Sequence, residues 1–401
     1  MISFDDAQQR LADAGVPIGT TEHVPLTQAA GRILAEVVVA TLDLPPADNS
    51  AMDGYAIRAT DFQPGVVLPI QERSFAGDKP QPLTPGHATR LFTGSIIPIG
   101  ADTVIMQEDT EEADGEVKLL VAPRPGQHVR KRGEDTTTGR ELIAAGTLLT
   151  AAHLTLLASQ GVATVTVFTR LRMGILTTGD ELVAPGEPRG EAQIYNSNGV
   201  MLATLATGLG AEVVHVLHAI DTKEDLQRAL RTLVDDCDLV VSVGGVSVGE
   251  RDLVKPAIED LGGTLDLWKV KMKPGKPVAL AHIDDTPIVC LPGNPVSAFA
   301  VFTLLVSPLI RRRQGRADIF PAVYAQTLRT EQPHQDDREE FLRVRASTAT
   351  GGNVELTAFG QQGSGIISSL PWASGLARIP AGTAVYDGEK VAYYDFSRWL
   401  A

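Results

Sequence analysis

The chain has 401 residues, of which 43% are hydrophobic and 21% charged, a composition typical of a soluble globular protein. Its length predicts about two to four domains. The net charge of −14, without any block of lysine or arginine, argues against nucleic-acid binding. Because the start MISFDDAQQRLADAG predicts an acidic amphipathic helix and no apolar run is long enough to span a bilayer, we expect a cytoplasmic protein without a membrane partner.

The first half of the chain alternates between helical and β-rich texture. Residues 1–42 are predicted to be helical, with breaks at Gly15 and Pro25, whereas short apolar runs between prolines and glycines predict a β-rich module at residues 45–134. The pattern returns to helix near Leu154 and Leu157. We therefore expect an N-terminal helical or linker domain, made of residues 1–44 and 135–170, with the β-rich domain inserted into it.

The second half predicts an open α/β domain followed by a small β-barrel. Strands and helices alternate over residues 171–318, and uninterrupted apolar runs such as DLVVSV are typical of a parallel sheet covered on both faces. Both cysteines, Cys237 and Cys290, lie in such runs, which favours a reducing compartment. Short strands separated by glycines predict a small barrel at residues 319–401. The predicted fold class is thus multi-domain α/β plus β.

The stretch SVGGVSVGERD, which follows one of these strands, begins with the glycine pair Gly244 and Gly245. It lacks the spacing of a dinucleotide fingerprint and the Gly-Lys-Ser/Thr ending of a P-loop. Two interpretations remain open. The stretch is either a tight strand-to-helix turn whose acids offset the helix dipole, or an anion site built from backbone N–H groups.

Two further stretches carry features of an anion site. In LPGNPVS, Asn294 suits a helix N-cap and Pro295 the first helical position, and Ser297 offers a hydroxyl nearby. In KVKMKPGKPVAL, four lysines surround a Pro-Gly turn, which predicts a local cationic loop for an oxyanion or phosphate. These lysines are Lys269, Lys271, Lys273 and Lys276. A capped helix and a solvated hairpin are the alternative interpretations.

Acidic residues follow three successive strands of the predicted sheet. Asp180 and Glu181 follow the first strand, Asp221 the second and Asp252 the third. Because ligands of open α/β sheets bind beyond the carboxyl ends of the strands, these acids predict a site for a hard divalent cation, with Mg²⁺ favoured by oxygen ligands.

The motifs together resemble one family. NSAMDGYA, FTGSIIPIGADTVIMQED, VRKRGEDTTTGRELIAAGTLL, SVGGVSVGERD, KPGKP and LPGNPVS occur in this order, and the ordered set is similar to the MoeA family of molybdopterin molybdenumtransferases, which includes the gephyrin E domain. The resemblance covers essentially the whole chain. It implies that the central α/β domain is MogA-like and that the subunits form a homodimer.

The resemblance also implies a reaction. Adenylylated molybdopterin and molybdate would react with insertion of the metal at the dithiolene and release of AMP, supported by Mg²⁺. Further proteins of molybdenum cofactor biosynthesis are implied as partners. None of the eight histidines lies in a matched motif, which argues against covalent acyl transfer.

Site residues follow from the resemblance position by position. Asp53, Thr93 and Asp135 would reach the site from the N-terminal domains, across the dimer, and Glu181, Asp221 and Asp252 would hold metal and phosphate. The substrate would bind at Gly244, Gly245, Ser247, Pro292 and Pro295. Molybdate would be received by Lys273, Lys276, Ser297, Arg343 and Ser364.

Three alternatives to this function remain. An adenylyltransferase of the same pathway would share the central domain but would not need the flanking modules. A gephyrin-like scaffold would be expected to carry a long linker and an additional domain. A nucleotide-binding regulator is the third alternative. Only the molybdenumtransferase requires AMP release.

Overall fold

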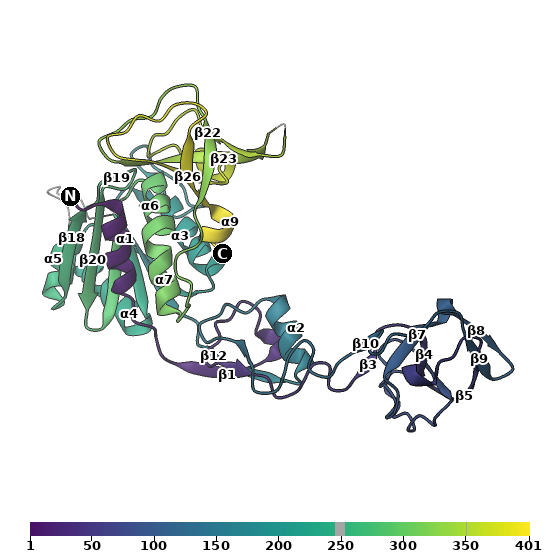
Figure 1. Cartoon of the computed structure of the whole chain (residues 1–401). Helices are drawn as coiled ribbons and strands as arrows, with labels where there is room; N and C mark the ends of the chain where they lie inside the picture. The colour runs from purple at the N-terminus through teal and green to yellow at the C-terminus, as the bar shows by residue number, and fades with distance from the viewer. Residues whose placement is uncertain (245–252, 350) are drawn as a thin grey trace. The chain divides into compact units, whose positions relative to one another are not determined.

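The chain folds into two compact units in a computed structural model that describes residues 1–244, 253–349 and 351–401 (Figure 1). Unit 1 comprises Met1–Glu36, Ala145–Leu154 and Ala163–Ala401, and unit 2 comprises Val37–Ala144 and Thr155–Val162. Helix α2 (Ala151–Ser159) crosses the boundary between the two units.

A six-stranded sheet forms the centre of unit 1, in the order β16-β13-β17-β21-β20-β18. The first four strands of this order are parallel; at one edge β20 pairs antiparallel with β21, and β18 pairs antiparallel with β20. Their bounds are β13 (Arg172–Thr178), β16 (Glu212–Ala219), β17 (Leu239–Val243), β18 (Thr264–Lys269), β20 (Pro277–Ile283) and β21 (Thr286–Leu291). The buried run of β17 confirms the predicted parallel strand, since both faces of the sheet are covered.

Helices cover both faces of this sheet (Figure 1). One face packs against α1, α3 and the helix from Pro295 in a core that includes Phe4, Leu202 and Phe302. The other face packs against α4 and α5 in a core that includes Leu230 and Ile258. The bounds are α1 (Phe4–Asp13), α3 (Ser197–Gly208), α4 (Lys223–Asp236) and α5 (Val254–Asp260).

The helix that starts at Pro295 consists of α6 (Pro295–Val301), a π-helical turn η4 (Phe302–Val306) and α7 (Ser307–Arg313). Among the described residues, this helix alone is long and apolar enough to cross a membrane, but 89% of the apolar window is buried inside the protein. It is therefore a core helix of the α/β domain.

A closed barrel forms the C-terminal part of unit 1. Its five strands pair in the circle β23-β24-β22-β26-β25, and β25 returns to β23, which confirms the predicted barrel. The bounds are β22 (Tyr324–Arg329), β23 (Glu339–Thr348), β24 (Val354–Ala358), β25 (Gly375–Ile379) and β26 (Lys390–Asp395), with short helices α8 (Ser369–Trp372) and α9 (Phe396–Trp399). The two-residue strand β19 (Met272–Lys273), from the lysine-rich loop, pairs with β23.

Unit 2 is built on a second six-stranded sheet, in the order β7-β4-β6-β5-β9-β8. Tyr55, Ile57, Leu68 and Val117 are among its core residues. The bounds are β4 (Gly54–Ile57), β5 (Val67–Ser74), β6 (Ala88–Leu91), β7 (Thr103–Met106), β8 (Thr110–Ala113) and β9 (Glu116–Leu119), and the two-stranded pairs are β2 (Val38–Val39) with β11 (Glu141–Ile143) and β3 (Asn49–Ser50) with β10 (Val129–Arg130).

The N-terminal segment differs from the prediction. Of residues 1–42, which were predicted to be helical, only Phe4–Asp13 form an α-helix. Strand β1 (Thr21–Pro25) instead pairs with β12 (Thr164–Phe168). Strand β1 is stabilised by a partner far along the sequence. The local pattern of apolar residues therefore does not indicate a strand there, and the helix prediction was wrong.

Candidate functional site

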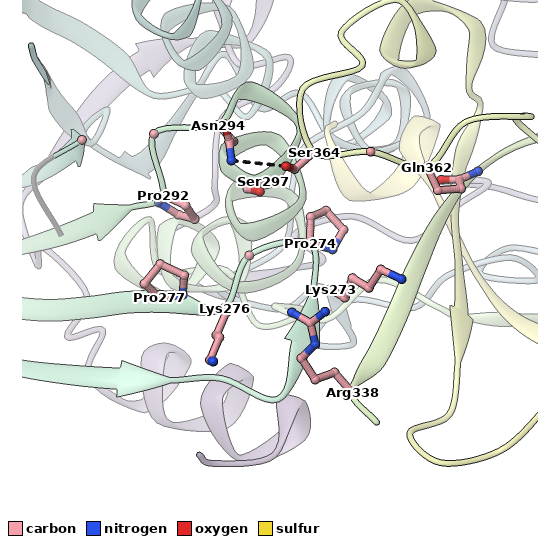
Figure 2. Close-up of a pocket in the computed structure, with 14 residues that line it drawn as sticks. Lys273, Pro274, Lys276, Pro277, Pro292, Asn294, Ser297, Arg338, Gln362 and Ser364 are labelled. Carbon is pink, nitrogen blue, oxygen red and sulfur yellow. Dashed lines mark hydrogen bonds between the residues drawn. The ribbon is translucent and has the colours of Figure 1, made fainter. Parts of the chain in front are cut away.

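A cavity of about 600 Å³ lies in unit 1, where the carboxyl ends of the central strands meet the C-terminal barrel. Five segments line it: the end of β17, the lysine-rich turn, the start of α6, the segment before β23 and the loop before α8 (Figure 2). The lining residues are Gly244, Lys273, Pro274, Gly275, Lys276, Pro277, Pro292, Gly293, Asn294, Ser297, Arg338, Gln362, Gly363 and Ser364. The cavity thus brings together the predicted residues Gly244, Lys273, Lys276, Pro292, Ser297 and Ser364.

The lysine-rich turn reaches the cavity because it packs closely on α6. Gly275 has φ +109°, and a β-carbon there would lie 2.5 Å from Cγ2 of Val301, so only glycine fits. Of the four lysines predicted to form a cationic loop, Lys273 and Lys276 line the cavity, and Lys269 and Lys271 are exposed outside it.

The ammonium of Lys273 is held by two carboxylates. Its Nζ lies 3.0 Å from Oδ2 of Asp336 and 2.9 Å from Oε1 of Glu340. Burial alone would lower the pKa of Lys273, but these hydrogen bonds outweigh it and raise the pKa above its ordinary value. Lys273 therefore stays cationic throughout the physiological range of pH.

Arg338 is a third cation of this wall, and the sequence motifs did not identify it. Its Nε donates to Oδ1 of Asp336 at 3.1 Å. Burial would raise the pKa of Asp336, but hydrogen bonds from Arg338 and Lys273 lower it to about 2, so Asp336 is ionised. Figure 2 shows Lys273, Lys276 and Arg338 along one side of the cavity. No recognisable motif surrounds Arg338, and its place follows only from the fold.

The start of α6 forms the opposite side of the cavity. Asn294 occupies the N-cap position, as predicted, but its side chain does not cap the helix. Instead its Nδ2 donates to Oγ of Ser364 at 3.2 Å (Figure 2). The backbone N–H of Val296 donates to the carbonyl of Ser364 at 3.2 Å. A barrel loop thus satisfies the helix end that is normally satisfied by the N-cap side chain. Ser297 lies beside this contact and is 5% exposed.

Arg343 lies behind the cavity wall and is not among the residues that line it. It is 1% exposed, and its guanidinium donates to the carbonyls of Gln361, Gln362 and Gly363. Burial lowers the pKa of Arg343 to about 10, so it remains charged. The structure therefore places Arg343 as a support for the loop that carries Ser364.

A second cavity, of about 390 Å³, adjoins the first and shares Gly244, Gly293 and Asn294 with it. Its other lining residues include the predicted residues Glu181 and Pro295. Asn198, which lines the same cavity, donates from Nδ2 to the carbonyl of Gly293 at 2.8 Å and so fixes the shared wall. The two cavities together could hold a small anion beside a larger organic molecule.

Two of the three residues predicted to hold Mg²⁺ lie at the carboxyl edge of the central sheet. Glu181 and Asp221 follow the adjacent strands β13 and β16, and both provide the carboxylate oxygens that Mg²⁺ prefers. Oδ1 of Asp221 accepts a hydrogen bond from Oγ1 of Thr178 at 2.8 Å. Within the described parts of the chain, no group of three histidine, cysteine, aspartate or glutamate residues is arranged to hold a metal. The donor chemistry of Glu181 and Asp221 fits a hard cation, and the expected third ligand, Asp252, lies outside the described residues, as do Gly245 and Ser247.

Unit 2 brings two of its three predicted site residues together. Oδ1 of Asp53 accepts hydrogen bonds from both the backbone N–H and the hydroxyl of Thr93, each at 2.8 Å. These bonds lower the pKa of Asp53, so the carboxylate is ionised. Asp135 is exposed, and its N–H donates to the carbonyl of Leu44 at 2.9 Å.

Comparisons with known proteins cover nearly the whole chain. Residues 2–161 match the MoeA N-terminal region (domains I and II), residues 174–312 match a probable molybdopterin binding domain, and residues 311–396 match the MoeA C-terminal region (domain IV). A molybdopterin molybdenumtransferase of Haemophilus influenzae is 37% identical over 378 residues, which is 92% of each chain. One of Nostoc is 37% identical and covers 92% of this chain and 88% of its own.

A solved structure agrees with these matches. The crystal structure of the molybdopterin biosynthesis protein MoeA from Pyrococcus horikoshii is similar with a TM-score of 0.83 and 32% sequence identity, and it covers 99% of each chain.

Proposed function

Because this chain belongs to the MoeA family, we propose that it is a molybdopterin molybdenumtransferase of molybdenum cofactor biosynthesis. It takes molybdate and adenylylated molybdopterin, inserts molybdenum at the dithiolene and releases AMP. This reaction joins an inorganic dianion to a large anionic organic molecule. Such a reaction needs positive charge at one substrate and neutralisation of the pyrophosphate at the other.

The observation that carries the proposal is the pair of adjoining cavities in unit 1. The larger cavity is lined by Lys273, Lys276 and Arg338 together with the hydroxyls of Ser297 and Ser364, which suit a tetrahedral dianion. The smaller cavity begins at Gly244, Gly293 and Asn294, where the two cavities meet. It lies at the carboxyl ends of the strands, the usual ligand position of an open α/β sheet, and is assigned here to the pterin nucleotide.

The remaining roles follow from these assignments. Glu181, with Asp221 and Asp252, would hold Mg²⁺, which supplies positive charge at the pyrophosphate. Arg343 supports the loop of Ser364 and acts on molybdate only through it. Asp53, Thr93 and Asp135, in unit 2, would complete the site from the second subunit of a homodimer. The cytoplasm is the proposed compartment.

An assay of AMP release tests this function. Purified protein is mixed with adenylylated molybdopterin, Mg²⁺ and varied molybdate. We expect Lys276→Ala to raise the molybdate concentration for half-maximal rate by about tenfold or more, because a charge facing the dianion is lost. Lys271→Ala is the matched control, since Lys271 is an exposed lysine of the same loop outside the cavity, and its molybdate requirement should equal that of the wild type.

The alternative functions give other results in the same assay. An adenylyltransferase would consume ATP and molybdopterin without molybdate, and a scaffold or regulator would release no AMP. If Lys276→Ala weakened binding of the pterin nucleotide at an unchanged molybdate requirement, the cavities would have to be reassigned.

A further inference from the structure

A chain of side-chain contacts leads from the cavity of about 600 Å³, called the oxyanion cavity below, to a separate cavity of about 500 Å³ in the C-terminal barrel. Lys273, in the wall of the first cavity, contacts Oε1 of Glu340 at 2.9 Å, and Oε2 of Glu340 lies 3.5 Å from Nδ1 of His334. His334 in turn lines the barrel cavity. One buried carboxylate therefore lies between a lysine in the wall of the first cavity and an imidazole in the wall of the second.

The fold fixes this arrangement. Strand β19 pairs with β23 so that Lys273 lies directly opposite Glu340, and Glu340 is 5% exposed. The other ring nitrogen of His334, Nε2, lies 3.1 Å from the hydroxyl of Thr330, and its backbone N–H donates to the carbonyl of Val385. A buried carboxylate is costly unless it is paired, and Glu340 is paired on both sides.

The charges of the cavity wall depend on His334. Lys273, Lys276 and Arg338 are opposed by Asp336 and Glu340, so a neutral His334 leaves one net positive charge for a dianion. Protonation of His334 raises the net charge to two and lets the imidazolium, rather than Lys273, balance the negative charge of Glu340. The ammonium of Lys273 can then direct its field and its hydrogen bonds to the bound anion.

We infer that Glu340 and His334 are positioning residues for oxyanion capture, which hold Lys273 and couple binding of the anion to protonation of His334. The inference rests on the proposed function, since it takes the cavity of Lys273 as the molybdate site. Linkage requires that a group whose protonation strengthens binding becomes more protonated when the ligand binds. The affinity for molybdate therefore rises as the pH falls, and binding takes up a fraction of a proton.

The groups around His334 favour this response. Glu340 faces one ring nitrogen and the hydroxyl of Thr330 the other. Arg329, Glu331 and Asp387 line the same barrel cavity. The positive charge of Arg329 is already engaged by Glu355 and Asp387, so it opposes protonation of His334 only weakly. The cavity gives the imidazole a route for proton exchange with solvent.

Calorimetric titration of the full chain with molybdate tests the inference. Titrations between about pH 8 and about pH 6, in buffers of different ionisation enthalpy, measure affinity and proton uptake together. For the wild type we expect affinity to rise about threefold to tenfold over this range, as expected for one coupled histidine. His334→Gln keeps a neutral polar side chain beside Glu340 and Thr330, and should lose both the rise and the proton uptake.

A matched control and a second variant make the result specific. His215 lies 2.8 Å from Asp236 and lines neither cavity, so His215→Gln removes another histidine–carboxylate pair and should keep the pH dependence of the wild type. Glu340→Gln keeps an oxygen that can accept from Lys273 but removes the charge that links it to His334. We expect this variant to bind molybdate at about pH 8 at least as tightly as the wild type does at about pH 6, without proton uptake.

Two outcomes overturn different statements. If the wild type does not bind molybdate at any pH, the assignment of the cavity and the proposed function fail. If it binds, and His334→Gln and Glu340→Gln both keep the pH dependence and proton uptake of the wild type, the proposed function stands and the coupling through Glu340 is wrong.

Discussion

Two arginines near the cavity show why a binding residue cannot be identified from its chemical type alone. Arg343 and Arg338 belong to the same segment, yet Arg343 directs its guanidinium to backbone carbonyls while Arg338 lines the cavity. Arg338 precedes β23 and Arg343 lies within it, so the fold and not the residue type decides which arginine meets the ligand. Arg343 contributes to the cavity by holding the loop that carries Ser364.

Gly179 allows a residue-scale test of the proposed metal ligand Glu181. It has φ +145°, and a β-carbon there would lie 2.5 Å from Oε2 of Glu181. Because the carboxylate is the end of a flexible side chain, Gly179→Ala should displace it rather than break the fold. We expect about 1–3 kcal/mol lower stability from backbone strain and a several-fold higher Mg²⁺ concentration for half-maximal AMP release.

The control for this test is Gly186→Ala. Gly186 also has a positive φ, +96°, but a β-carbon there meets nothing within 4 Å. Thermal melts should show a comparable loss of stability, whereas the Mg²⁺ requirement should not change. If the two variants need the same Mg²⁺ concentration for half-maximal AMP release, Glu181 is not a ligand of the metal.

At the scale of elements, a local irregularity in the core helix is compensated by a distant helix. Pro308 has no N–H to donate to the carbonyl of Leu304, four residues earlier. Nε2 of Gln8, on α1, donates to this carbonyl at 2.7 Å instead. Gln8→Leu would leave the buried carbonyl without this donor and should lower the free energy of unfolding by about 1–3 kcal/mol.

Chemical denaturation followed by tryptophan fluorescence measures this loss, because Trp268, Trp372 and Trp399 all belong to unit 1. Gln9→Leu is the control, since Gln9 is an exposed neighbour that bonds only to Asp13 on its own helix among the contacts described. Its effect should stay within about 0.5 kcal/mol. If both variants lose the same free energy of unfolding, the hydrogen bond of Gln8 to the carbonyl of Leu304 does not contribute to stability.

The elements also show what the sequence could predict. The α/β domain and the terminal barrel were predictable, because their strands and helices follow local periodicity. The pairing of Val24 with Val165, and the use of Asn294 to hold Ser364 rather than to cap α6, depend on partners far along the chain. The lysines at 273 and 276 were predicted from their unusual density, but the carboxylates of Asp336 and Glu340 beside them were not, since neither acid lies in one of the motifs.

At the scale of the whole molecule, the predicted site residues belong to both compact units. Lys276 belongs to unit 1, and the hydrogen-bonded pair Asp53 and Thr93 belongs to unit 2. If unit 2 of one subunit completes the site of the other, as we propose, two inactive variants can complement each other. Asp53→Asn and Lys276→Ala each remove one half of the site and should release little AMP alone at limiting molybdate.

When the two variants are mixed and allowed to exchange subunits, half of the dimers contain one copy of each. In such a dimer one site combines both defects and the other combines both intact halves. About a quarter of all sites should therefore regain wild-type activity.

Asp53→Asn mixed with Thr93→Val is the control, because both changes lie in unit 2 and every site then keeps one defect. Light scattering establishes that dimers are present. If mixed dimers form and AMP release does not recover, each site is completed within one subunit, and the proposed contribution across the dimer is wrong.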